Sequence, residues 1–459
     1  MIRERLSDAL GAGSVLYAPE DLAVYRFDGY ATGATPGVVV LPQNTREVCA
    51  VMKIARDCGV PVVARGAGTG LCGGATPGPD AVVISFARMN RILELDVAHQ
   101  RVRVQPGLVN LELSTNVAHN QLFYAPDPAS QRSCTIGGNI GTNAGGPHCL
   151  AYGTTTSHVL GLEVVDEFGD IFHTHIDDIG YDLTGALVGG EGTLGLVTSA
   201  WLRLTRTPPA VRVWLASFND IESASETVSA IIRSGIVPTA LEMMDATIIA
   251  AVEAVYHAGY PTNAAAVLLI ENAGFEEDMQ QCEADLARIC RDHSALSWRV
   301  ATSQQERDAL WLGRKSAAGA IGSLSPNYYI QDVTVPRSKL PQALRAVEHA
   351  VHANGLRVGN VFHAGDGNLH PLIMYDKRNA REVAAVVDAG TEILTTAIAL
   401  GGTISGEHGI GSEKRETLGL VYSEDDLDPM LRLRNVFNAS GYLNPEKIFP
   451  RGARCAEVQ

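Results

Sequence analysis

The sequence lacks the features that mark several classes of protein. Its 459 residues carry a formal net charge of −15, so no basic excess is available for nucleic acid or an anionic membrane surface. No apolar run reaches the ~18 residues of a spanning helix, and the N-terminus has no apolar signal-peptide segment. The eight cysteines contain no CxxC pair, which excludes the usual iron–sulfur and zinc-knuckle motifs. We therefore expect a cytoplasmic protein with reduced thiols, no transmembrane segment and no nucleic-acid partner.

The length of the chain and a change in its composition and predicted elements indicate two domains. At 46% apolar residues the chain can build sizeable cores, and 459 residues is long for a single core. The first half is rich in glycine, whereas after Pro208-Pro209 short strands and helices alternate. The final segment, which includes Leu443-Asn444-Pro445, is too short to form a domain.

A glycine-rich loop follows a predicted β-α-β unit. Gly68 to Gly73 matches G-x-G-x-x-G, but Pro77 and Pro79 prevent the helix that a plain dinucleotide fold opens there. A turn of backbone N–H groups can still cradle a pyrophosphate, although a surface loop of small residues is the alternative. The predicted elements before the loop are a strand at 38–42, a helix at 45–57 and a strand at 61–65.

Two further tracts of glycine and small polar residues lie at 127–146 and 188–198. A single phosphate would need only one such tract. Three tracts indicate one elongated ligand that the backbone touches at several points.

The second half predicts an α+β fold with an antiparallel sheet and ferredoxin-like halves. We expect strands at 212–218, 239–245, 264–272, 298–302 and 328–335, and helices at 222–234, 246–256, 276–292, 303–320, 339–354 and 380–400.

A histidine-bearing hairpin, 363–370, stands between two apolar strands. Asp366-Gly367 is typical of a two-residue turn with positive φ at both positions, which pairs Gly365 with Asn368 and His363 with His370. Opposed imidazoles on one face form half of a transition-metal site. A structural hairpin with capped histidines is the alternative.

A second segment, 405–411, offers Glu407 and His408 between glycines. Glu407 can complete a His2Glu set with open coordination positions, as catalytic sites keep, which leaves His408 for proton transfer. Because the two residues are adjacent, we expect their side chains to leave the backbone in different directions.

Several motifs together resemble the FAD-linked 2-hydroxy acid oxidoreductases of the vanillyl-alcohol-oxidase fold, in particular the type of the bacterial glycolate oxidase D subunit (glycolate dehydrogenase). The likeness covers nearly the whole chain. The motifs are ARGAGTGLCGG (64–74), IGGNIGTNAGG (136–146), GGEGTLGLVT (189–198), LEMMD (241–245), FHAGDGNLHPLI (362–373), ISGEHGIG (404–411) and LNPEKIF (443–449).

The resemblance implies a PCMH-type FAD-binding domain of two subdomains at 1–207, a cap domain at 208–412, and a segment at 413–459 that returns to the FAD domain. Thr69 stands where relatives with covalent flavin carry histidine, so FAD is expected to bind non-covalently. The implied flavin contacts are Gly66, Gly68, Thr69, Gly70, Leu71, Gly138, Gly141, Thr142, Asn143, Glu191, Gly192, Val197 and Asn444.

The resemblance also implies roles in the reaction. His363, His370 and Glu407 are expected to bind a divalent metal, zinc in the first place, with manganese or iron as alternatives. His408 is the expected base, and Arg314 the expected partner of the substrate carboxylate, with a helix-surface ion pair as its alternative. Metal-assisted removal of the hydroxyl proton and hydride transfer to flavin N5 would oxidise glycolate or D-lactate to the 2-oxo acid.

Three alternatives accompany this interpretation. D-2-hydroxyglutarate is a rival substrate, which the isoleucine at position 330 disfavours because that family places a basic residue nearby. A flavin-dependent transferase and a non-catalytic paralogue are the others. Since this chain has no cluster motif, we expect electrons to pass to an iron–sulfur partner subunit or a quinone-linked carrier, with the inner membrane as a peripheral location.

Overall fold

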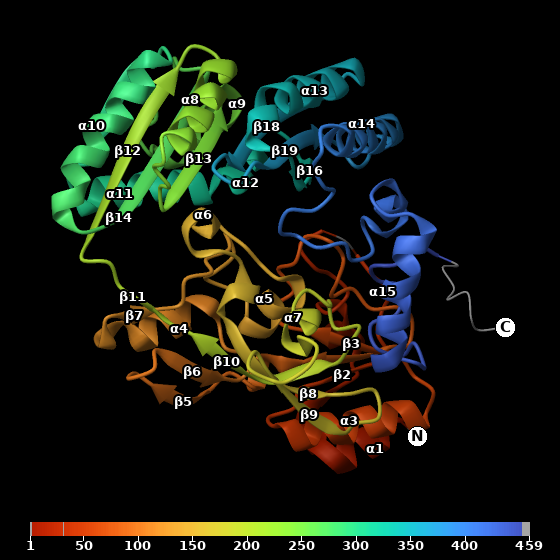
Figure 1. Ribbon diagram of the computed structural model, residues 1–459. Coiled ribbons are helices and arrows are strands. Elements are labelled where there is room, and N and C mark those ends of the chain that lie inside the picture. Colours follow the sequence, from red (N-terminus) through yellow and green to blue (C-terminus); the bar gives the residue numbers. More distant parts are fainter. Residues whose placement is uncertain (1, 31, 452–459) are drawn as a thin grey trace. The chain divides into compact units, whose positions relative to one another are not determined.

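The computed structural model describes residues 2–30 and 32–451 (Figure 1). Contacts divide the chain into two units. Unit 1 comprises Met1–Gly146, Gly153–Thr207 and Glu407–Gln459, and unit 2 comprises Pro147–Tyr152 and Pro208–Gly406. The domain boundaries predicted from the sequence lie after residues 207 and 412.

Unit 1 contains a four-stranded sheet of order β1-β2-β4-β3, in which β2, β4 and β3 are parallel. Runs of valine form these strands because β-branched side chains suit a buried pleated surface. Helix α3 packs Val48, Val51 and Met52 into the same core. The bounds are β1 (Val15–Leu16), β2 (Val38–Val40), β3 (Val62–Arg65), β4 (Val82–Ser85), α1 (Ile2–Leu10), α2 (Pro19–Ala23) and α3 (Thr45–Asp57).

A second sheet of unit 1 is antiparallel, with the order β5-β6-β10-β8-β9. It has its own core with α4 and α5, so unit 1 has two subdomains. The bounds are β5 (Ile92–Asp96), β6 (Arg101–Val104), β8 (Val159–Val165), β9 (Ile171–His175), β10 (Leu196–Arg203), α4 (Asn110–Val117), α5 (Ile136–Thr142) and α7 (Leu183–Leu187), with β7 (Leu122–Phe123) paired to β11 (Thr205–Arg206).

The C-terminal tail of unit 1 joins the first sheet. After α15 (Glu424–Phe437), Leu443 forms a parallel bridge with Val62 of β3. The N–H of Asn444 donates to Val62 O at 2.8 Å, and the N–H of Val62 donates to Tyr442 O at 2.8 Å. The tail therefore belongs to the core of unit 1.

Unit 2 is built on one antiparallel sheet of order β15-β12-β14-β13-β18-β19-β16, with β17 beside β19. Figure 1 labels β12, β13, β14, β16, β18 and β19 of these strands. The first four strands have the ferredoxin-like order, with α9 inserted between β13 and β14. The predicted α+β class is confirmed. The strands are β12 (Ala210–Phe218), β13 (Ala240–Asp245), β14 (Ala266–Gly274), β15 (Ser297–Val300), β16 (Asn327–Ile330), β17 (Val333–Thr334), β18 (Arg357–His363) and β19 (Asn368–Tyr375).

One face of this sheet carries α9, α11 and α12 in a single hydrophobic core with Val213, Met244 and Leu372. Glu242, His363 and His370 lie on the same face, because they alternate with the same parity as Met244, Val361 and Leu372. The helices of unit 2 are α6 (Cys149–Tyr152), α8 (Ile221–Arg233), α9 (Ala246–Tyr256), α10 (Glu276–Asp292), α11 (Gln304–Lys315), α12 (Ala317–Ala320), α13 (Leu340–Ala353) and α14 (Ala380–Ala399).

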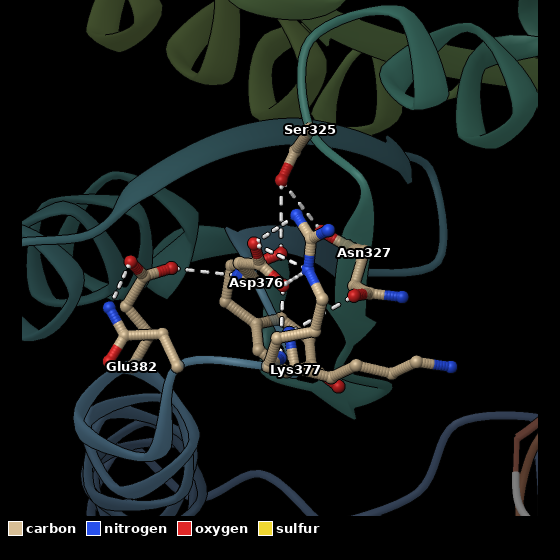
Figure 2. A network of polar contacts seen from close by, with 8 residues as sticks. Ser325, Asn327, Asp376, Lys377 and Glu382 are labelled. Atoms are coloured by element: carbon tan, nitrogen blue, oxygen red, sulfur yellow. Dashed lines mark hydrogen bonds and ion pairs between the residues drawn. The ribbon is translucent and has the colours of Figure 1, made fainter.

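A polar network secures the outer edge of the sheet, where β19 leads into α14 (Figure 2). Ser325 Oγ donates to Tyr375 O at 3.1 Å, and the Lys377 N–H donates to Asn327 Oδ1 at 3.0 Å. The Asp376 N–H donates to Glu382 Oε2 at 2.7 Å. The first two bonds fix the outer strand β16 against the end of β19, and the third joins that end to α14.

Candidate cofactor and metal sites

The three glycine tracts meet inside unit 1. A Cβ built on Gly66, directly after β3, would lie 2.2 Å from Thr135 Oγ1, the residue that caps α5 in the second tract. The backbone N–H of Glu191, in the third tract, donates to Gly141 O at 2.8 Å. Tracts separated by up to about 130 residues therefore surround one place, as an elongated ligand requires.

Open space lies beside two of these glycines. A Cβ on Gly70 or on Gly141 would meet no atom within 4 Å, whereas one on Gly68 would lie 2.1 Å from Arg65 Nη2. Backbone exposed to open space at Gly70 and Gly141 fits a pyrophosphate that approaches the chain closely.

Several other predicted flavin residues lie on the elements that carry the second and third tracts or on the tail. Gly138 and Thr142 lie in α5, Asn143 is its left-handed C-cap, and Val197 lies in β10. Asn444 Nδ2 donates to Gly74 O at 2.9 Å and to Glu191 O at 2.6 Å. The tail thus joins the first tract to the third.

Glu191 has a second task that the sequence did not indicate. Its carboxylate accepts from the Ile410 N–H at 2.8 Å and the Gly411 N–H at 2.9 Å. Desolvation raises the pKa of Glu191, and the two backbone bonds oppose that shift only in part. This side chain therefore holds the segment that carries His408.

Glu407 and His408 do not diverge as expected. His408 Nε2 lies 4.0 Å from Glu407 Oε1, and both side chains are mostly buried. The two tips turn toward each other, because the irregular backbone between glycines does not impose the alternation of a strand.

The histidine hairpin of unit 2 has a different register from the predicted one. His363 pairs with Asn368, and His370 pairs with Val361. Of the two predicted turn residues, Asp366 and Gly367, only Gly367 has positive φ. The turn is therefore the longer loop Ala364–Gly367. A slip of two residues keeps the face, since the side-chain period is two. The imidazoles still meet, with ring centroids 5.1 Å apart and planes at 88°.

A buried carboxylate joins His363 to Arg314. Glu242 of β13 lies 2.9 Å from His363 Nδ1 through Oε1 and 2.5 Å from Arg314 Nη2 through Oε2. Desolvation alone would raise the pKa of Glu242, but the charges and hydrogen bonds of Arg314 and His363 outweigh it, and the pKa is lowered. Arg314 is 6% exposed, so a helix-surface ion pair does not describe it.

A second buried carboxylate, Asp332, stands beside His370. Its Oδ1 lies 3.8 Å from His370 Nδ1, while Oδ2 accepts from Ser405 Oγ at 2.8 Å and from the Gly406 N–H at 3.0 Å. A Cβ at position 406 would lie 2.3 Å from Asn368 Oδ1, so this turn requires glycine. Glu407 follows Gly406 by one peptide bond.

Sequence reasoning missed the roles of Glu242 and Asp332. Both are fully buried, and buried charges are rare unless they are paired. A glutamate inside the apolar strand Ala240–Asp245 was the available signal. The partners of Glu242 could not be read from the chain because they lie 72 and 121 residues away.

Comparisons with known proteins identify the family of this chain. The family "FAD binding domain" matches residues 36–175, and "FAD linked oxidases, C-terminal domain" matches residues 207–448. Glycolate oxidase subunit GlcD of Escherichia coli is 42% identical, over 96% of this chain and 90% of its own length. GlcD of Bacillus subtilis is 40% identical, over 97% and 94%. D-2-hydroxyglutarate dehydrogenase of Stutzerimonas stutzeri is 32% identical, over 97% and 98%.

Solved structures share the fold at low identity. p-Cresol methylhydroxylase superposes with a TM-score of 0.80 at 16% identity, over 97% of this chain and 96% of its own. Alkyldihydroxyacetonephosphate synthase superposes with a TM-score of 0.76 at 17% identity, over 97% and 84%. The predicted FAD-binding fold is confirmed, and this chain belongs to the FAD-linked oxidases, as an FAD-linked 2-hydroxy acid oxidoreductase similar to the GlcD subunits.

Proposed function

We propose that this protein oxidises a small 2-hydroxy acid, glycolate or D-lactate, to the 2-oxo acid. The cluster of His363, Glu242 and Arg314 carries the proposal. In it the buried carboxylate of Glu242 contacts both the imidazole of His363, the proposed metal ligand, and the guanidinium of Arg314, the proposed partner of the substrate carboxylate. The high identity to GlcD subunits supports glycolate in particular.

FAD would be bound by the glycine tracts of unit 1, without a covalent bond. The open space at Gly70 and Gly141 supports this, and Thr69 supplies no imidazole for attachment. The purified protein should be yellow and should release intact FAD on acid precipitation. Flavin that remains with the precipitate would contradict the non-covalent mode.

A divalent metal, zinc or else manganese or iron, would be held by His363, His370 and Glu407. Glu242 on His363 Nδ1 and Asp332 near His370 Nδ1 support the imidazoles as ligands, since ligating histidines usually have such partners. When bound, FAD supplies the hydride acceptor, and the cation lowers the pKa of a coordinated hydroxyl. Full turnover by protein that elemental analysis finds metal-free would exclude this part.

Two residues of the chain would bind the substrate carboxylate and remove the hydroxyl proton. Arg314 Nε is buried with no hydrogen-bond partner among the described residues, so this guanidinium retains a donor for the substrate carboxylate. His408, as the base, would take the hydroxyl proton.

We further propose that a partner subunit that carries an iron–sulfur cluster, or a quinone-linked carrier, would accept the electrons of the reaction. The relatives from Escherichia coli and Bacillus subtilis are named as subunits. No helix in residues 2–30 and 32–451 has both the length and the apolar character to cross a bilayer. Attachment at the membrane would then come through the partner.

An anaerobic screen of small D-2-hydroxy acids tests the function. Glycolate or D-lactate should bleach the flavin absorbance fastest. Fastest bleaching by D-2-hydroxyglutarate would favour that alternative, although the side chain at Ile330 offers no charge for a distal carboxylate. Flavin that no hydroxy acid reduces would favour a transferase, as the shared fold with alkyldihydroxyacetonephosphate synthase allows.

A further inference from the structure

One carboxylate outside the proposed ligands and base contacts two of the residues assigned to the reaction. Glu242 is fully buried in the middle of β13. Both of its oxygens lie within 3.0 Å of His363 Nδ1, and Oε2 also contacts Arg314 Nη2. β13 pairs with β18 so that Glu242 stands directly opposite His363.

We propose that Glu242 is a positioning residue that prepares His363 as a metal ligand and holds Arg314 beside it. This inference rests on the proposed function, because the metal and the substrate carboxylate are its objects. It adds a residue to which neither the motifs nor the family comparisons assign a role.

The contact with Glu242 selects one tautomer of the His363 imidazole. A carboxylate can only accept, so its contact with Nδ1 places the imidazole proton on Nδ1. The lone pair then lies on Nε2, which is the form that binds a metal. The cross-strand position of Glu242 also restricts rotation of the ring.

The negative charge of Glu242 holds the Arg314 guanidinium beside His363. Arg314 Nη2 lies 3.4 Å from His363 Nδ1, and with the imidazole proton on Nδ1 both atoms are donors. Without an acceptor between them, the guanidinium and the imidazole N–H would repel each other in a buried place. Glu242 supplies that acceptor, and so a single carboxylate keeps both groups on the same face of the sheet.

Glu271 offers a matched control on the neighbouring strand. It is buried on the same face of the sheet, accepts from Trp311 Nε1 of α11 at 2.7 Å, and lies 2.9 Å from His148 Nε2. Like Glu242, it joins the sheet to α11 and contacts a histidine. Unlike Glu242, it contacts none of the proposed ligands.

The experiment compares Glu242→Gln with Glu271→Gln in the full chain loaded with FAD. Zinc affinity is measured by competition with a chromophoric chelator, and thermal unfolding and FAD content are measured in parallel. Glutamine keeps one acceptor but turns its NH2 group toward either His363 or Arg314. We expect Glu242→Gln to weaken zinc binding by about 10–100-fold, while Glu271→Gln binds zinc as the wild type does.

A spectroscopic readout separates positioning from general destabilisation. In protein labelled with 15N-histidine and free of metal, the His363 ring, assigned with a His363→Gln variant, should show the Nδ1-protonated tautomer in the wild type and a mixture in Glu242→Gln. Should Glu242→Gln not fold, Glu242→Asp and Glu271→Asp carry the same comparison.

Equal zinc affinity in the wild type and Glu242→Gln, or equal losses in the Glu242 and Glu271 variants, would overturn the inference and leave the proposed function intact. A wild type that binds no zinc, manganese or iron would instead overturn the proposed metal site. The two failures are therefore distinguishable.

Discussion

The predicted sites of the two units differ in the groups that form them, which are backbone groups in unit 1 and side chains in unit 2. In unit 1 the predicted flavin site consists largely of backbone, with glycines that leave open space at Gly70 and Gly141. In unit 2 the proposed site consists of side chains, and the buried carboxylates Glu242 and Asp332 contact the two histidines. A site formed by backbone groups tolerates any side chain that stays out of the space for the ligand. A site formed by side chains depends on every atom that takes part in their hydrogen bonds. The comparison teaches that the two sites should fail in different ways.

The largest effect should come from the residues between the glycines at 405–411. His408→Ala should keep FAD and metal but lose about 10²–10⁴-fold in kcat, the usual contribution of a general base. Glu407→Ala should lose the metal together with activity. Metal content and the rate of anaerobic flavin reduction, measured side by side, test the assignment. If His408→Ala loses the metal while Glu407→Ala retains it, the two roles are reversed.

A single added methyl group at Gly70 should weaken FAD binding at the backbone site. Gly70→Ala meets open space in the protein itself, so the fold should tolerate it, but the added Cβ would occupy the place proposed for the pyrophosphate. We expect FAD affinity to fall by roughly an order of magnitude or more, which corresponds to a loss of ~1.4 kcal/mol or more in binding free energy. FAD titration into apoprotein measures it.

Gly78→Ala is the control for that prediction, because its Cβ also meets no atom within 4 Å and its φ is not positive. Unchanged FAD affinity in Gly70→Ala would remove this loop from the flavin site.

The side-chain site should be sensitive even to a conservative change. Arg314→Lys keeps a positive charge near Glu242 but loses the planar fork that binds a carboxylate through two parallel bonds. We expect KM for the hydroxy acid to rise on the order of tenfold, with FAD content unchanged. Steady-state kinetics with glycolate and D-lactate measure it. A variant with wild-type KM would show that another group binds the substrate carboxylate.

The smallest effect concerns stability at the edge of the side-chain site. Asp245 caps α9 and accepts from the Asn360 backbone N–H at 2.6 Å. Burial raises its pKa from 3.8 to about 6. Above pH ~6 the carboxylate is ionised in both the folded and unfolded states. Between pH ~6 and ~4 only the folded state takes up the proton, so falling pH stabilises the fold.

Asp245→Asn should remove this contribution. The difference in Tm between wild type and variant should shift in favour of the wild type, by a few degrees at most, as pH falls from 7 to 4. A difference that does not change with pH would show that Asp245 has no raised pKa.

Local elements were predictable because their signals are local. The helices Thr45–Asp57, Ala246–Tyr256 and Glu276–Asp292 have the predicted bounds. Apolar spacing and capping residues such as Asn44, whose side chain accepts from the Glu47 N–H, are written within a few residues of each helix. The hairpin at 363–370 was predicted with the wrong register because loop length depends on Val335 and Arg337, which pack against its turn.

The sequence by itself determined the FAD-binding family, the density of glycine in three tracts, and the presence of His363, His370, Glu407 and His408. Only the tertiary structure decided which groups serve those residues. Glu242 and Asp332 gain their roles from cross-strand pairing and from a turn that lies 73 residues away from Asp332. A buried carboxylate acts on the donors that surround it in space, and that neighbourhood exists only after the sheet has formed.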